Sequence, residues 1–256
     1  MMQIQTHFTP HDVDEIALRE KTAVVIDVLR ASTTVITALS NGAREVIPTP
    51  TVEAAAKIAG HLAGDVTIRG GEQNGRIIDG FSIGNSPLEY VEERVRDRSI
   101  VYSTREGSPL FLKAKYAKHM LVCGFVNISA VAGFLKEHAA DIEILCTGNN
   151  GRFAIEDAVC AGMLVHLLGE EADAQLALCD ASIAAHSLYR THYRNLHRML
   201  RQSESGKFLE GLGYLDDLRY CAGVDTVPVL PVLEDNMLRL WKDNDRRESP
   251  STPASA

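Results

Sequence analysis

The sequence lacks the features that mark secreted, membrane-spanning and disulfide-rich proteins. Its five cysteines are an odd number, lie scattered along the chain and form no C-x-x-C pair, so we expect reduced, buried thiols. The first residues, MMQIQTHF, lack the basic flank and apolar core of a signal peptide. No apolar stretch approaches the ~20 residues that cross a bilayer. We therefore expect a soluble, cytoplasmic protein.

A positive field is also missing. The formal net charge is −8 over 256 residues, and no run of Lys or Arg stands out. Nucleic acids and anionic membranes both attract positive charge, so neither is an expected partner. If this acidic chain binds an anion, it needs a local positive pocket supplied by arginines, helix N-termini or a metal ion.

Two common nucleotide-binding motifs are absent. No G-x-G-x-x-G follows a predicted strand, and G-x-x-x-x-G-K-[ST] does not occur. The sequence therefore gives no support for a dinucleotide fold or a P-loop.

Short runs rich in Val and Ile alternate with helical segments over the first 170 residues. The predicted strands are 22–29, 44–48, 66–69, 99–103, 119–124 and 141–146. Apolar strands separated by helices predict an α/β fold, with a mainly parallel sheet flanked by helices.

The helices between these strands have recognisable ends. The segment S-P-L-E at 86–89 is a capping box that predicts a helix over 87–98. The other expected helices are 52–63 with Thr51 as N-cap, 128–139 with Asn127 as N-cap, and 153–168, which ends at Gly169.

A helix-rich C-terminal part follows residue 170. Residues 173–203 predict one or two long helices, followed by two short helices and a final strand over 227–233. The long segment carries His186, His192, His197, Arg190, Arg194, Arg198 and Arg201. Because the histidine spacings do not suit a metal site, we expect a solvated helix or the contact of a homodimer. We divide the chain into an α/β region (1–170), this C-terminal part packed on it (171–248) and a disordered tail (249–256).

Polar residues gather where the predicted strands end. Asp27 and Arg30 follow the first strand, Glu72 the third and Arg105 the fourth, while Asp157 comes soon after the sixth. In a parallel sheet these ends share one edge, where open α/β sheets bind ligands and helix N-termini face anions. A carboxylate such as Asp27 after an apolar run is costly unless paired or metal-bound. Arg30 could instead be only its structural salt-bridge partner.

Carboxylates and arginines together favour metal-assisted phosphoryl transfer. Hard carboxylate oxygens suit Mg²⁺. Arginine, Ser and Thr side chains, together with helix N–H groups, suit phosphate oxygens. The expected partner is therefore a small anionic phosphate ester.

At these same loops the sequence resembles the 2-phosphosulfolactate phosphatase family. The matching segments are VVIDVLRASTT (24–34), GGEQNG (70–75), GFSIGNSPLEY (80–90), STREGS (103–108) and CTGNNGRFAIEDAVCAG (146–162), with a thinner likeness at SGKFLEGLG (205–213). The family's fourth loop usually reads S-T-T-N-G-T, whereas this chain has Arg105, Glu106 and Ser108. The resemblance implies a distinctive α/β fold and an acid-active, Mg²⁺-dependent phosphatase. It also implies a substrate of coenzyme M biosynthesis, a three-carbon sulfonated hydroxyacid phosphate, or a related small acid.

We hypothesise roles for individual residues. Asp27, Glu72 and Asp157 would hold Mg²⁺, with Glu156 as the alternative to Asp157. Asp27, Glu72 and Arg30 form the expected catalytic group. The expected substrate-binding residues are Ser32, Thr33, Thr34, Asn74, Asn85, Ser103, Thr104, Arg105, Gly107 and Asn127.

Alternatives stay open at this point. Cys146 and Arg152 form a C-x₅-R segment between a strand and a helix, the layout of cysteine phosphatases, although the usual flanking His and Ser/Thr are missing. A non-catalytic binding protein for an anionic metabolite would use the same loops. A covalent Asp27 nucleophile of the haloacid-dehalogenase type is disfavoured, because Leu29 stands where a second Asp is needed.

Overall fold

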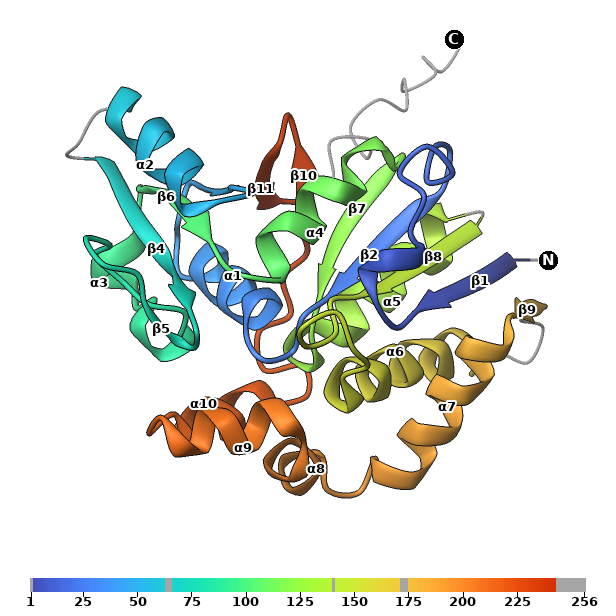
Figure 1. Cartoon of the computed structure of the whole chain (residues 1–256). Helices are drawn as coiled ribbons and strands as arrows, with labels where there is room; N and C mark the ends of the chain where they lie inside the picture. The colour runs from blue at the N-terminus through green and yellow to red at the C-terminus, as the bar shows by residue number, and fades with distance from the viewer. Residues whose placement is uncertain (1, 63–65, 140, 171–174, 243–256) are drawn as a thin grey trace, which may run out of the picture.

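The centre of the structure is a mixed β-sheet with helices on both faces (Figure 1). The computed structural model describes residues 2–62, 66–139, 141–170 and 175–242, and the tail predicted over 249–256 lies outside them. The strands are β1 Met2–His7, β2 Thr22–Ile26, β3 Glu45–Pro48, β4 Thr67–Gln73, β5 Arg76–Ile77, β6 Ser99–Ser103, β7 His119–Cys123, β8 Asp141–Cys146, β9 Leu176–Leu178, β10 Pro231–Glu234 and β11 Met237–Leu240. Most pairings are parallel, which confirms the predicted α/β fold.

Helices connect most of these strands. They are α1 Ala31–Ser40, α2 Val52–His61, α3 Glu92–Val95, α4 Gly107–Lys113, α5 Ile128–His138, α6 Ile155–Leu168, α7 Asp180–His192, α8 Leu196–Gln202, α9 Glu204–Gly211 and α10 Leu215–Cys221. Within the described ranges, none is long and apolar enough to cross a membrane.

An antiparallel hairpin from the C-terminal part joins two parallel blocks of strands. The order across the sheet is β5-β4-β6-β3-β11-β10-β7-β2-β8-β1-β9. Strand β10 pairs with β7 through Val232 and Leu121, and β11 pairs with β3 through Leu238 and Val46. The C-terminal hairpin therefore completes the sheet between β3 and β7.

Apolar residues are buried on both faces of the sheet. All of β2 is buried. Its alternate residues Val24 and Ile26 pack with α5 and α6, whereas Ala23 and Val25 pack with α1 and α4. Successive side chains of a strand point to opposite faces, so one short strand supplies both cores.

Several strand limits differ from the sequence prediction. Strand β2 ends at Ile26 instead of residue 29, which leaves Asp27–Arg30 as the loop before α1. Strand β4 extends to Gln73. Strands β1, β5 and β9 were not predicted, because the first alternates with polar residues and the other two are very short.

The predicted helix over 87–98 is wrong. The chain forms a 3₁₀ turn over Pro87–Glu89 and the one-turn helix α3 instead. Ser86 does not cap a helix, because its hydroxyl donates to Asp217 Oδ1 at 2.6 Å. The Glu89 carboxylate accepts from the Gly84 N–H at 2.9 Å. Tertiary contacts thus override the local capping pattern.

The other helix ends agree in part with the prediction. Thr51 caps α2 by accepting from the Ala54 N–H at 3.1 Å, and α6 ends at Gly169. Asn127 precedes α5, but its side chain makes no cap. Its amide instead joins Gly124 N–H at 3.0 Å to the carbonyl oxygens of Val122 and Val229.

The C-terminal part is more divided than predicted. Residues 173–203 include strand β9 and the separate helices α7 and α8. The final strand predicted over 227–233 overlaps only β10, and β11 was not predicted. His186 Nε2 lies 3.4 Å from Nδ1 of His166, so that histidine contacts α6 and not the neighbouring histidines of its own segment.

The ion pair between Glu45 and Arg239 gives a test of how the hairpin is held. Arg239 donates to Glu45 Oε2 from Nη2 at 2.6 Å and from Nε at 3.1 Å, across β3 and β11. Ser99 donates to Oε1 at 2.8 Å. Burial alone would raise the pKa of Glu45, but these hydrogen bonds lower it below the usual 4.5.

We expect Glu45→Gln to lower the free energy of unfolding by about 1 kcal/mol at neutral pH, since Arg239 is partly exposed. A lowered carboxylate pKa stabilises the fold above the unfolded value, so the difference from wild type should vanish as the pH falls below 4.5. Urea unfolding over a pH series measures it, with exposed Glu234→Gln as control. A pH-independent difference would contradict this account.

Candidate active site

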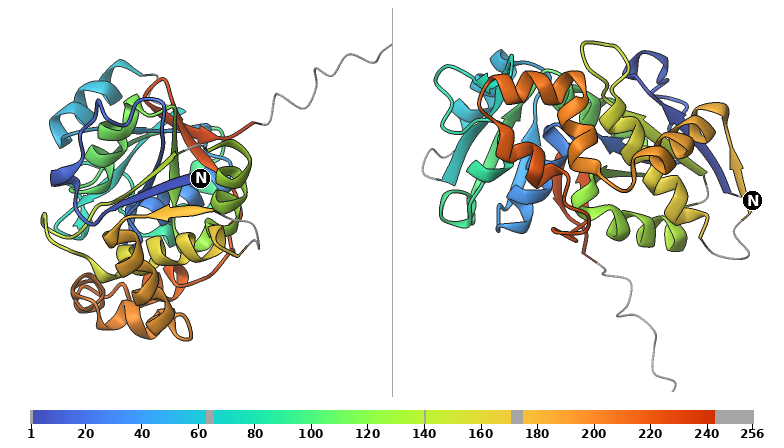
Figure 2. Two further views of the ribbon diagram at one scale, coloured as in Figure 1. Left: turned by 90° about the vertical axis from the view of Figure 1, so that its right-hand side faces the viewer. Right: turned by 90° about the horizontal axis from the view of Figure 1, so that it is seen from below.

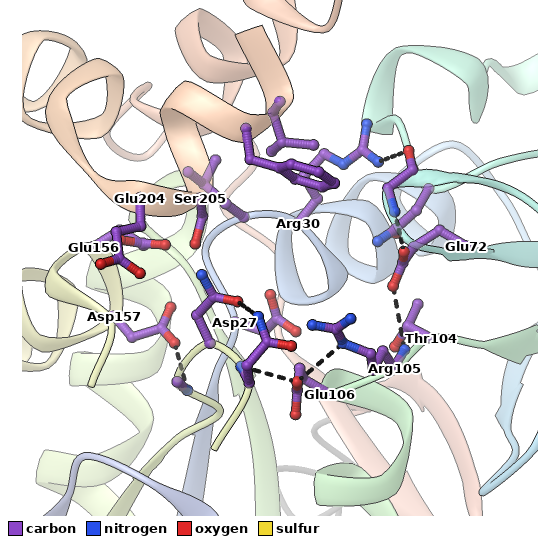
Figure 3. Close-up of a pocket in the computed structure, with 18 of the residues that line it drawn as sticks. Asp27, Arg30, Glu72, Thr104, Arg105, Glu106, Glu156, Asp157, Glu204 and Ser205 are labelled. Carbon is purple, nitrogen blue, oxygen red and sulfur yellow. Dashed lines mark hydrogen bonds and ion pairs between the residues drawn. The ribbon is translucent and has the colours of Figure 1, made fainter. Parts of the chain in front are cut away.

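The carboxyl ends of strands from both parallel blocks, β2 and β8 in one and β4 and β6 in the other, meet at one cavity of about 540 Å³ (Figure 3). The loops after β2, β4, β6 and β8 line it, together with the first turn of α6 and helix α9. Seen from below, α8, α9 and α10 lie across this side of the molecule (Figure 2). The predicted residues that line it are Asp27, Arg30, Glu72, Asn74, Asn85, Thr104, Arg105, Glu156 and Asp157. The structure therefore brings most of the predicted residues together.

Six predicted residues do not line the cavity. These are Ser32, Thr33, Thr34, Ser103, Gly107 and Asn127. The N–H groups of Ser32 and Thr34 are bound to the carbonyls of Asp27 and Arg30, both at 2.9 Å, so they do not face a ligand. The Ser32 hydroxyl accepts from the Asp27 N–H at 2.9 Å. Ser32 and Thr34 therefore stabilise the turn that carries Asp27 and Arg30.

Gly107 allows the start of α4 to lie very close to the loop that carries Asp27. A Cβ atom at this position would lie 2.4 Å from the Ala31 Cβ and 2.8 Å from Asp27 Oδ2. Only glycine therefore lets the start of α4 pack against the Asp27 loop.

Asp27 is a buried carboxylate among other carboxylates. Its Oδ1 accepts from the Ala31 N–H at 3.2 Å, and the residue is 7% exposed. Burial raises the pKa of Asp27 to about 7; the Ala31 hydrogen bond opposes the shift, and the charges of Glu72, Glu106 and Glu156 add to it. The protein thus holds an anion here at an energetic cost.

Asp157 and Glu156 both face inward from the first turn of α6. Asp157 accepts from the Val28 N–H at 2.9 Å, the Thr147 hydroxyl at 3.1 Å and the Gly148 N–H at 3.2 Å. It therefore ties the ends of β2 and β8 together. Burial raises the pKa of both carboxyls, although hydrogen bonds from serines of the α9 segment oppose the shift at Glu156.

Glu72 organises the loops after β4 and β6. Its two oxygens accept from the N–H groups of Gly75 at 2.7 Å and Arg105 at 3.2 Å. The Arg105 side chain reaches Asn74 Oδ1 and Glu106 Oε1, both at 3.3 Å. Glu106 also accepts from the N–H of Asn150 at 3.1 Å, so hydrogen bonds link three loops around the cavity.

Arg30 is a buried cation with fixed partners. Its Nη1 donates to Asp217 Oδ2 at 2.6 Å, and its Nη2 donates to the Gly75 carbonyl at 3.0 Å. The Tyr214 ring lies 4.2 Å from the guanidinium carbon. Its ion-pair partner is thus Asp217 and not Asp27, contrary to the structural alternative considered from the sequence.

Negative charge exceeds positive charge around the cavity. Six acids and three arginines line it: Asp27, Glu72, Glu106, Glu156, Asp157 and Glu204 against Arg30, Arg105 and Arg152. Each arginine already pairs with an acid: Arg30 with Asp217, Arg105 with Glu106 and Arg152 with Glu204. Within the described part of the chain, Asp27, Glu72, Glu156 and Asp157 have no cationic side chain at ion-pair distance.

The carboxylates of the cavity are suitable ligands for a hard cation, but their oxygens do not converge on a single metal position. Carboxylate oxygens that lack a cationic partner are the ligands that Mg²⁺ prefers. Among residues 2–62, 66–139, 141–170 and 175–242, however, no three His, Cys, Asp or Glu side chains converge closely enough to hold a metal ion. Binding would therefore require these side chains to move.

The cysteine alternative finds no support in the geometry. Cys146 is buried at the end of β8 and does not line the cavity. Burial, together with the charge of Asp157, raises the pKa of its thiol well above the usual range. A neutral, enclosed thiol is a poor nucleophile. Arg152 lines the cavity but pairs with Glu204 at 3.3 Å.

Sequence reasoning missed the part of the cavity that α9 supplies. Glu204, Ser205, Phe208 and Leu209 line it, although they come more than thirty residues after the last strand loop that was considered. In the sequence, the only sign of this role is the likeness of segment 205–213 to the family.

Together, the fold and the cavity define an α/β protein with a small-ligand site at the carboxyl ends of its parallel strands. The chain belongs to the 2-phosphosulpholactate phosphatase family, whose model matches residues 7–236. This confirms the resemblance found in the sequence.

Relatives cover nearly the whole chain. A protein of Caldanaerobacter subterraneus subsp. tengcongensis is 35% identical over 242 residues, which are 94% of this chain and all of the relative. One from Clostridium novyi is 36% identical over 230 residues (90% of this chain, 96% of the relative). One from Gloeobacter violaceus is 38% identical over 232 residues (90% and 94%). Each is named "Probable 2-phosphosulfolactate phosphatase", a phosphoric monoester hydrolase.

Gly107→Ala tests the close packing beside Asp27. We expect it to lower the free energy of unfolding by about 1–3 kcal/mol, because the added methyl group meets Ala31 and Asp27. Gly133 lies within α5 with no atom within 4 Å of an added Cβ, so Gly133→Ala should be neutral or stabilise by up to ~1 kcal/mol. Chemical denaturation of both variants measures the difference. Equal stabilities would refute the crowding.

Proposed function

We propose that the protein hydrolyses 2-phosphosulfolactate, or a closely related phosphorylated hydroxyacid, to the hydroxyacid and phosphate. The observation that carries this proposal is the cavity that combines the fixed cation Arg30 with unpaired buried carboxylates. The names of the relatives support the choice of substrate.

The arginines suit the several charges of such a substrate. Arg30 retains N–H groups beyond the two it uses, and a guanidinium matches the oxygens of a phosphoryl group. Arg105 is 42% exposed and makes only 3.3 Å contacts, so it can exchange Asn74 and Glu106 for a sulfonate or carboxylate. Thr104 and Asn85 also line the cavity as neutral hydrogen-bonding groups.

The proposal includes Mg²⁺, held by Asp27 and Glu72 with Glu156 or Asp157. Glu156 is the better third ligand, because its partners are the hydroxyls of Ser203 and Ser205, which can rotate away, whereas Asp157 is held by the backbone N–H groups of Val28 and Gly148. When bound, the ion would offset the negative charge that the carboxylates and a phosphoryl group bring together. Arg30 would meanwhile orient the phosphoryl oxygens, and α9 would limit the access of water.

We also propose a cellular location and a metabolic setting for the protein. We propose a cytoplasmic protein of sulfonate metabolism, the setting of coenzyme M biosynthesis, because all five cysteines are free thiols. A formal charge of −8 does not favour a nucleic-acid partner. A homodimer through the helices after residue 170 stays a prediction.

A metal titration tests the carboxylate cluster without any assay of activity. A carboxylate whose folded pKa is about 7 against 3.8 in the unfolded chain loses stability as the pH rises through that range. In EDTA at pH 8, Asp27→Asn should therefore unfold at a higher temperature than wild type. Added MgCl₂ should raise the Tm of wild type and of the exposed control Asp79→Asn, but much less that of Asp27→Asn. Identical responses of all three proteins would rule out Asp27 as a ligand.

Kinetics test the phosphatase itself. Phosphate release is measured from 2-phosphosulfolactate and from a panel of phosphorylated hydroxyacids, with MgCl₂ or EDTA. Arg30→Lys should lower kcat/KM by about 100-fold, because an ammonium group cannot reproduce the planar fork. Binding of every ester without turnover would mean a metabolite-binding protein, and normal kinetics for Arg30→Lys would make Arg30 structural.

A further inference from the structure

We infer that Asp217 is a positioning residue, which sets the orientation of the Arg30 guanidinium toward the substrate. The two residues lie 187 positions apart and meet in a buried ion pair at 2.6 Å. The inference rests on the proposed function, since it assigns the orientation of the cation that binds the phosphoryl group.

Both oxygens of Asp217 are occupied by groups from different segments. Oδ2 accepts from Arg30 Nη1, and Oδ1 accepts from the hydroxyl of Ser86 at 2.6 Å. The residue lies in the first turn of α10 and is 2% exposed. With a short hydrogen bond on each oxygen, the carboxylate cannot rotate without losing one of them.

The guanidinium is restrained on two further sides. Its Nη2 donates to the Gly75 carbonyl, and the Tyr214 ring covers it at 4.2 Å. Together with the bond to Asp217, the guanidinium uses two of the five N–H groups of an arginine side chain. Among the residues that the structure describes, the other three donate no hydrogen bond, and Arg30 lines the cavity, so they can meet an anion.

Stability alone does not explain this buried pair. Removing two charges from water is costly, and apolar residues of similar volume often replace such a pair without loss of stability. A carboxylate that also neutralises the only deeply buried arginine of the cavity would weaken anion binding if charge were all that mattered. Fixed orientation is the benefit that remains, because a phosphoryl group needs donors in a defined plane.

The neighbouring Asp216 offers a matched control. Its side chain is 77% exposed and pairs only with Arg219, at 3.5 Å on the surface of α10. Asp216→Asn and Asp217→Asn therefore make the same chemical change in the same helical turn, and only the second one touches Arg30.

The test compares these two variants in turnover and in the binding of inorganic phosphate by calorimetry. Asp217→Asn should lower kcat by about 10- to 100-fold and weaken phosphate binding, as loss of a supporting hydrogen-bond partner commonly does. Asp216→Asn should match wild type. If the buried charge of Arg30 prevents Asp217→Asn from folding, Ser86→Ala keeps the ion pair and removes only one restraint. This variant should fold, with the lower Tm expected for the loss of one buried hydrogen bond, and its kcat should fall several-fold.

A double variant separates positioning from a merely structural role. If Asp217 acts through Arg30, Asp217→Asn in an Arg30→Lys background should cost little beyond Arg30→Lys alone. The inference would be overturned if the loss of kcat in the double variant equalled the product of the two single losses. It would also be overturned if Asp217→Asn kept the wild-type kcat and phosphate affinity. A wild type that cleaves no ester but binds phosphate more tightly than Asp217→Asn would instead overturn the proposed function and leave the role of Asp217 standing.

Discussion

The pairing of β10 with β7 and of β11 with β3 is the contact on which the candidate site depends. It inserts the last strands of the chain between two parallel blocks that the earlier residues build separately. Because α8, α9 and α10 precede this hairpin, they must return past the carboxyl ends of the parallel strands. That return brings Asp217 to Arg30 and α9 to the cavity. The helices that complete the cavity and the hairpin that completes the sheet thus belong to one C-terminal segment of the chain.

The electrostatics of the cavity then follow from its place in the sheet. The ends of β2 and β8 are buried, so Asp27 and Asp157 lie in a medium that disfavours their charge. The arginines are already matched to other acids, which leaves a cluster of negative charge that the described residues do not neutralise. A fold tolerates such a cluster at the cost of stability, and functional sites are where that cost is commonly found. This cluster of negative charge supports the proposal that the site binds a cation.

The sequence predicted the parts of this arrangement that depend on local pattern. Apolar runs located the main strands, and polar residues after them located Asp27, Glu72 and Arg105 in the cavity. Contacts between distant segments could not be predicted: Ser86 resembles a helix cap but donates to Asp217, and Asn127 resembles a ligand-binding residue but joins backbone groups. The contribution of α9 was missed for the same reason. Apart from the family likeness of 205–213, nothing in the sequence near residue 205 indicates that Ser205 hydrogen-bonds to Glu156.

In the fourth loop, the two charged residues that depart from the usual family pattern compensate for each other. Arg105 and Glu106 add opposite charges that pair with each other at 3.3 Å, so the net charge of the cavity is unchanged. Each also contacts a neighbouring loop, Arg105 through Asn74 and Glu106 through the N–H of Asn150. Neither contacts Arg30 or Asp157. The change therefore alters the rim, where the acid groups of the proposed substrate would lie, and it reaches the buried residues only through the charge of Glu106, which adds to the raised pKa of Asp27. A difference in substrate preference is a more natural consequence of this substitution than a difference in chemistry.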